Sequence, residues 1–157
     1  YPEIFKIPSL RVTKSITIRR TVMIKLVVGL KGSGKTKTLI ERANTAADET
    51  KGSVVCIEKG DKLIHEIKYQ GRLVDTDEYN VTTAASLYGF IAGMYASNHD
   101  ITNVFVDSAL KICGNNMETF EQLVLELDKL TEKNSFDVFM TSSCTEDDLP
   151  ASVKKYL

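Results

Sequence analysis

The chain alternates between short apolar runs and longer stretches in which apolar residues recur every three or four positions. The short runs are rich in β-branched residues and have the length of strands that are buried on both faces. They cover residues 23–28, 53–57, 103–106 and 136–140, and residues 72–76 fit a brief additional strand at a sheet edge. About five strands are therefore expected, and their apolar character favours parallel pairing.

The stretches between these strands are predicted to be helical. Apolar stripes at helical spacing cover residues 35–50 and a long segment that starts near residue 115, and residues 61–68 fit a short helix. A further helix, capped by Thr82 or Thr83 and ending near residue 97, is apolar on most sides. Asp61 is expected to cap the short helix, and Asn115 or Asn116 the long one, with Glu118 as the capping-box acid after Asn115. Strand and helix thus alternate from residue 23 onwards. This alternation predicts an α/β fold with a mostly parallel central sheet and helices on both faces.

Residues 1–22 differ in composition from the rest of the chain. They contain two of the three prolines and three of the five arginines, and Met23 opens the first predicted strand. Our hypothesis is that residues 1–22 are a non-native or mis-assigned extension, and that the domain comprises residues 23–157. The competing interpretation is a short extra strand, because residues 12–18 are also β-rich.

Charge and cysteine usage narrow the class of protein. The net charge of −1 offers no electrostatic basis for binding nucleic acid or an anionic membrane. The apolar stretch at residues 84–96 is shorter than the roughly 20 residues that span a bilayer, so no membrane span is expected. The three scattered cysteines, Cys56, Cys113 and Cys144, suggest reduced thiols and a cytoplasmic location.

One segment carries specific chemistry, between the first predicted strand and the first predicted helix. Residues 29–36 match the pattern G-x-x-x-x-G-K-[ST], which in this context binds the phosphates of a nucleotide. Its glycines allow backbone N–H groups to turn inward, and the helix that follows adds the positive end of its dipole. The candidate nucleotide contacts are Gly29, Leu30, Lys31, Gly32, Ser33, Gly34, Lys35, Thr36 and Lys37. The alternative is a glycine turn that binds nothing.

Two residues of this pattern have more specific expected roles, and a third residue joins them from a distant strand. Lys35 would reach the β and γ phosphates, and Thr36 would offer its hydroxyl to Mg²⁺. Mg²⁺ bound to a nucleotide keeps several waters and takes one or two protein oxygens. Asp107, which follows the apolar run at residues 104–106, is the candidate to hold one of those waters. The alternative is an aspartate that caps the following loop.

Three segments together resemble the RecA-like branch of the P-loop NTPases. Residues 29–36 match Walker A, Val-Phe-Val-Asp-Ser at residues 104–108 resembles the Asp-Ser form of Walker B, and Val-Val-Cys-Ile-Glu at residues 54–58 resembles the strand that ends in the catalytic glutamate. The resemblance implies a three-layer fold with Lys35 and Glu58 as catalytic residues, Glu58 polarising the attacking water. It also implies that Thr141 senses the γ-phosphate. The sequence further resembles small uncharacterised P-loop ATP-binding proteins of Firmicutes, some of which are labelled PilT-like.

The expected function is that of a Mg-ATP-binding protein with weak ATPase activity, whose nucleotide state regulates an unidentified partner or its own self-association. No N-K-x-D motif is present, which favours ATP over GTP. After residue 22 the arginines are Arg42 and Arg72, and neither fits an arginine finger, which raises hydrolysis by about 10³–10⁵. Two alternatives stay open: a small-molecule phosphotransferase with Glu58, Asp75 or Asp77 in its acceptor pocket, and a non-catalytic nucleotide-sensing module.

Overall fold

The computed structural model of the protein describes residues 23–68 and 71–157, so both interpretations of residues 1–22 lie outside the described part. Its centre is a five-stranded sheet with the order β1-β5-β4-β2-β3, in which all neighbouring strands are parallel. The strands are β1 (Ile24–Gly29), β2 (Ser53–Glu58), β3 (Gly71–Asp75), β4 (Ile101–Val106) and β5 (Asp137–Ser143). The predicted α/β sheet of about five strands is confirmed, and its short third strand lies at an edge.

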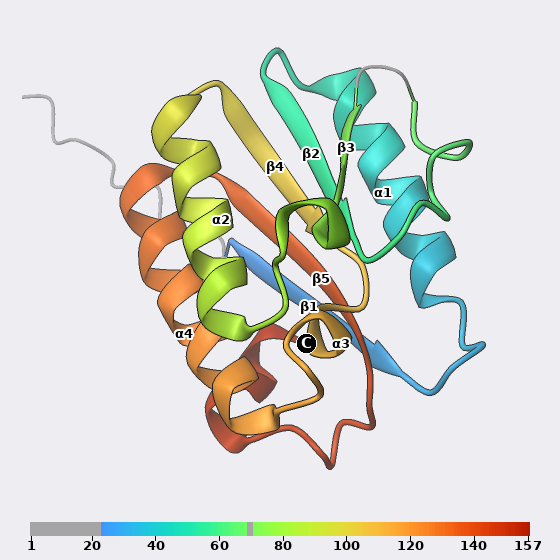
Figure 1. Cartoon of the computed structure of the whole chain (residues 1–157), viewed down its shortest axis with the longest axis vertical. Coiled ribbons are helices and arrows are strands. Elements are labelled where there is room, and N and C mark those ends of the chain that lie inside the picture. Colours follow the sequence, from blue (N-terminus) through green and yellow to red (C-terminus); the bar gives the residue numbers. More distant parts are fainter. Residues whose placement is uncertain (1–22, 69–70) are drawn as a thin grey trace, which may run out of the picture.

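Helices cover both faces of this sheet (Figure 1). They are α1 (Lys35–Glu49), α2 (Ala84–Ser97), α3 (Ala109–Ile112) and α4 (Met117–Asn134), with the 3₁₀ turns η1 (Thr76–Tyr79) and η2 (Ala151–Tyr156). Helix α1 packs on one face through Leu39 and Ala43, while α2, α3 and α4 share a larger core on the other face. Within the described residues, no helix combines the length and the apolar character needed to cross a membrane.

The prediction of a short helix at residues 61–68 is wrong, because this segment forms hydrogen-bonded turns. Tertiary contacts take up the backbone groups that a helix would need. The Leu63 amide donates to the Glu58 carboxylate at 2.8 Å, and the Asn44 side chain bonds the Glu66 carbonyl and the Lys68 amide. The loop is thereby fixed against both β2 and α1.

The start of α4 also differs from the capping box expected at Asn115. Asn116 is the N-cap, and its side-chain oxygen accepts the Thr119 amide at 3.1 Å. Asn115 has a left-handed backbone with φ 57°, which ends the turn that follows α3. The helix therefore begins one residue later, and Glu118 cannot serve as the box acid.

Cys56, Cys113 and Cys144 are buried and free, and they pack in the core as small apolar side chains. Burial raises the pKa of Cys56 and of Cys113 to about 12, so both thiols stay protonated at neutral pH.

The C-terminal segment η2 packs against the core through Val153 and Tyr156, and the Tyr156 hydroxyl donates to Asp128 at 2.6 Å.

Candidate functional site

The glycine loop, residues 29–36, makes a tight turn between β1 and α1. Gly32 and Gly34 have φ of 85° and 87°, a left-handed backbone that favours glycine. The Ser33 amide donates to the Leu30 carbonyl at 3.1 Å, and a Cβ on Gly29 would lie 2.5 Å from the Ser33 hydroxyl oxygen. The loop therefore turns back on itself, and it requires glycine at positions 32 and 34 for backbone conformation and at position 29 for space beside Ser33.

The backbone N–H groups at the start of α1 are available to a ligand. Among the described residues, no protein acceptor is bonded to the amides of Gly34, Lys35 and Thr36. The first amides of any helix lack partners within it, and they lie at the positive end of the helix dipole. The sequence G-K-T thus begins a helix whose first amides have the arrangement that binds anions at helix N-termini.

Lys35 folds back over the glycine loop. Its Nζ donates to the Leu30 carbonyl at 3.0 Å and to the Ser33 hydroxyl at 3.4 Å. Leu30 is 66% exposed, and Lys31 and Lys37 are also exposed around the loop. The ammonium group therefore lies beside the free amides, on the same short turn of chain.

Polar residues from four strands form a row across the carboxyl end of the sheet. The register places Thr141 of β5, Asp107 after β4, Glu58 of β2 and Asp75 of β3 at matching positions. Side chains alternate between the two faces along a strand, so one row of parallel strands points to one face. Cys56, Phe105 and Phe139 lie two positions before Glu58, Asp107 and Thr141, and they pack in the core beneath α1. The carboxyl-end row therefore points to the face that α1 covers.

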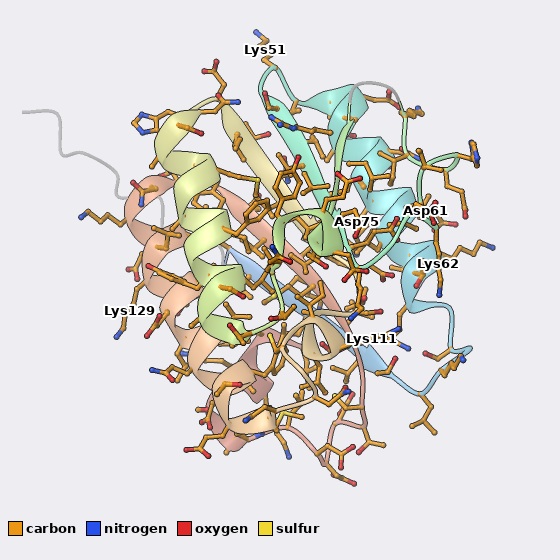
Figure 2. The ribbon with its side chains drawn as sticks, in the orientation of Figure 1. Lys51, Asp61, Lys62, Asp75, Lys111 and Lys129 are labelled. Atoms are coloured by element: carbon orange, nitrogen blue, oxygen red, sulfur yellow. The ribbon has the colours of Figure 1, made fainter. Side chains whose placement is uncertain are left out.

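Figure 2 shows one member of this row, Asp75, at the carboxyl end of β3, with Asp61 of the loop that follows β2 nearby. The Asp75 carboxylate accepts the amides of Gly60 at 2.8 Å and Asp77 at 2.9 Å. Asp77 also pairs with Lys59 at 3.8 Å. Asp75 and Asp77 therefore fasten the loops after β2 and β3 to one another.

Hydrogen bonds connect the glycine loop to the carboxyl-end row. The Thr36 hydroxyl donates to Asp107, with Oγ1 at 3.2 Å from Oδ1 and 3.4 Å from Oδ2. The Thr141 hydroxyl donates to Asp107 Oδ1 at 2.7 Å and accepts the Ser108 amide at 2.8 Å. Thr36 is exposed and Asp107 is half-buried. Hydroxyl and carboxylate oxygens are the ligands that Mg²⁺ takes from proteins.

Glu58 lies beside Asp107 in the row, but its side chain is buried. It is 2% exposed, and its Oε1 accepts the Leu63 amide at 2.8 Å. Burial raises the pKa of the Glu58 carboxyl above its ordinary value, and the charges of Asp107, Asp75 and Asp61 add to that increase. The Leu63 hydrogen bond opposes the shift, because it favours the ionised carboxylate.

Glu58→Gln is expected to stabilise the protein at neutral pH and to lose this advantage in acid. A carboxyl group with a raised pKa in the folded state makes the protein less stable as pH rises above the ordinary glutamate pKa of about 4.3. The amide cannot ionise, yet its oxygen can still accept the Leu63 hydrogen bond. Urea unfolding of both proteins should give a free-energy difference that is small below the ordinary glutamate pKa of about 4.3 and grows as pH rises above it. A constant difference would contradict a buried carboxylate.

The arginines of the described residues lie away from the carboxyl-end row. Arg42 lies over the Phe139 ring at 5.5 Å, in a cleft lined by α1, the start of β1, the middle of β4 and the first residues of β5. Arg72 is exposed on the edge strand β3, near its start. In residues 23–68 and 71–157, the site therefore contains no guanidinium group.

The structure brings together residues that the sequence placed far apart. Lys35, Thr36, Asp107, Glu58 and Thr141 all gather at the carboxyl end of the sheet, on the side of α1. Sequence reasoning missed the Leu63 amide on Glu58, for which the chain has no local signal. No family model matches the chain, and no curated protein matches it. Membership in the P-loop NTPases therefore stays a resemblance.

Proposed function

We propose that the protein binds Mg-ATP between the glycine loop and the carboxyl-end row, and that it hydrolyses ATP slowly. The observation that carries this proposal is the hydrogen bond between Thr36 and Asp107, which are 71 positions apart in the chain. It joins the free amides and the ammonium group of the loop to a carboxylate delivered by a separate strand. A glycine turn that binds no ligand would not require free amides, an ammonium group and a carboxylate in one place.

The arrangement of secondary structure supports a three-layer P-loop fold of the RecA-like kind. The glycine loop joins β1 to α1, and the residues that resemble the other motifs follow β2 and β4, at the same end of the sheet. Ligands of open parallel sheets bind at this end. The segments that resemble the P-loop motifs therefore agree with the resemblance in their place in the sheet as well as in their sequence.

Each group has a role that follows from its chemistry. The free amides of Gly34, Lys35 and Thr36 would donate to phosphate oxygens, and the Lys35 ammonium would exchange its contact with the Leu30 carbonyl for the phosphate chain. Thr36 and Asp107 would hold Mg²⁺, Asp107 through a water. When bound, Mg²⁺ offsets negative charge on the phosphates.

Turnover should be slow, for two structural reasons. Glu58, proposed to polarise the attacking water, is capped by the Leu63 amide beneath the loop that follows β2. The described part of the site also has no arginine to neutralise charge that develops in the transition state. Slow turnover suits a protein whose ATP-bound state persists long enough to regulate a partner or its own self-association.

A phosphotransferase is less favoured by the contacts. Asp75 and Asp77, the candidate acceptor residues, are engaged with loop amides and with Lys59. Within the described residues, no hydrogen bond or ion pair connects either carboxylate to the glycine loop, beside which an acceptor pocket would have to lie. The non-catalytic sensing module differs from our proposal in the absence of turnover alone, so hydrolysis assays separate the two.

Thermal unfolding with nucleotides tests the proposal. A ligand at 100 times its Kd adds about 2.7 kcal/mol of stability, which for this chain length raises the melting temperature by about 5–10 °C. We expect that increase with ATP and ADP in the presence of Mg²⁺, and a smaller one with GTP or with EDTA. An unchanged melting temperature and no calorimetric heat at millimolar Mg-ATP would overturn the proposal.

A further inference from the structure

We infer that Thr141 is a positioning residue for Asp107 and that it does not contact the γ-phosphate. The inference rests on the proposed function and specifies how the metal-binding carboxylate is held. It departs from the role implied by the resemblance, in which Thr141 senses the γ-phosphate.

The hydrogen bonds of Thr141 account for its single hydroxyl proton. Its Oγ1 accepts the Ser108 amide at 2.8 Å, so its own proton is directed to Asp107 Oδ1, 2.7 Å away. Phosphate oxygens are acceptors and need a donor. A threonine hydroxyl has one donor, and here the Asp107 carboxylate receives it. Contact with a γ-phosphate would therefore cost the bond that holds Asp107.

The rest of Asp107 is held just as firmly. Its backbone amide donates to the Ile57 carbonyl of β2 at 2.9 Å, and the next residue, Ser108, has a left-handed backbone with φ 55°. Thr141 is 1% exposed, so solvent does not compete for its hydroxyl. Thr141 thus forms hydrogen bonds to both residues that follow β4, to the Asp107 carboxylate and to the Ser108 amide. The carboxylate is thereby aimed at Thr36.

The neighbouring hydroxyl provides a matched control. Ser142 is also 1% exposed, but it lies on the opposite face of β5, where its Oγ accepts the Leu110 amide of α3 at 3.3 Å. Ser142→Ala therefore removes a buried hydroxyl of the same strand end without touching Asp107. A loss of nucleotide affinity that Thr141→Val and Ser142→Ala share would therefore reflect a general structural effect and not the contact with Asp107.

The experiment is isothermal titration calorimetry of the whole chain with ADP and with ATP, each in Mg²⁺ and in EDTA. For Thr141→Val we expect Mg-ADP and Mg-ATP affinities to fall equally, by about 10–100-fold, the usual cost of removing a group that orients a metal ligand. Affinities in EDTA should stay unchanged. Thr141→Ser, which keeps the hydroxyl, should restore the wild-type Mg²⁺ dependence, and Ser142→Ala should retain it.

A double-mutant cycle with Asp107→Asn tests whether Thr141 acts through Asp107. We expect Thr141→Val to add no further loss in the Asp107→Asn background, because coupled residues are non-additive. A loss confined to ATP would overturn the inference in favour of γ-phosphate sensing. An unchanged Mg²⁺ dependence with a lowered melting temperature would reduce Thr141 to a structural residue. If wild-type protein binds neither nucleotide, the proposed function fails first, and this inference fails with it.

Discussion

Lys35→Ala is expected to weaken Mg-ATP binding by about 10–100-fold, the range for one or two hydrogen bonds to charged groups. The Lys35 ammonium lies over the glycine loop, bonded to the Leu30 carbonyl and the Ser33 hydroxyl. These two partners are neutral, so a phosphate chain is a stronger acceptor for the same proton donors. Calorimetric titration with Mg-ATP measures the loss directly.

Lys51→Ala is the matched control for this prediction. It changes the net charge equally, but Lys51 precedes β2 at the amino end of the sheet, and Figure 2 shows it far from the labelled Asp75. Its removal should leave Mg-ATP affinity within about a factor of two, because exposed charges beyond a Debye length of about 8 Å are largely screened. Equal losses in both variants would indicate a general charge effect and would contradict a direct role for Lys35.

Glu58→Gln is expected to lower ATP turnover by about 10²–10⁴-fold, the usual contribution of a general base, while Mg-ATP affinity stays unchanged. The carboxylate is next to Asp107 in the carboxyl-end row and lies outside the glycine loop that is proposed to hold the phosphates. Because basal turnover should be slow, single-turnover hydrolysis of radiolabelled ATP is the suitable measurement. Affinity is measured in parallel by calorimetry.

Glu66→Gln provides the control for Glu58. Glu66 lies in the same loop that covers Glu58, but it is exposed and contributes its backbone carbonyl to Asn44. Its substitution should change neither turnover nor affinity. If Glu58→Gln hydrolyses ATP as fast as the wild type, Glu58 has no catalytic role, and the Leu63 contact is structural. A loss of affinity in Glu58→Gln would instead place Glu58 among the binding residues.

The local part of the site could be predicted from the sequence. Residues 29–36 follow an apolar run and precede an amphipathic stretch, and in that context their glycines and Lys35 predict phosphate binding. Asp107 and Glu58 could be predicted as strand-end carboxylates, because each follows a short apolar run directly. The conformations of the strands, the glycine loop and α1 depend on residues that are close in the chain, so the local sequence is sufficient to predict these elements.

Local pattern failed where distant residues supply the partners. Residues 61–68 have helical spacing, yet the Glu58 carboxylate and the Asn44 side chain bond their backbone and hold them in turns. Asn115 and Asn116 are equally good caps by composition. The turn after α3, which leaves Asn115 left-handed, decides between them.

The sequence by itself determined which residues are candidates to bind phosphate and which strands end in side chains that carry oxygen. The tertiary structure alone decided that β5 lies between β1 and β4, which places Thr141 against Asp107 and Asp107 against Thr36. The physical reason is that strand order and register arise from hydrogen bonds and packing between segments far apart in the chain. No local propensity encodes them, although a shift of one residue would turn every side chain of this row to the other face.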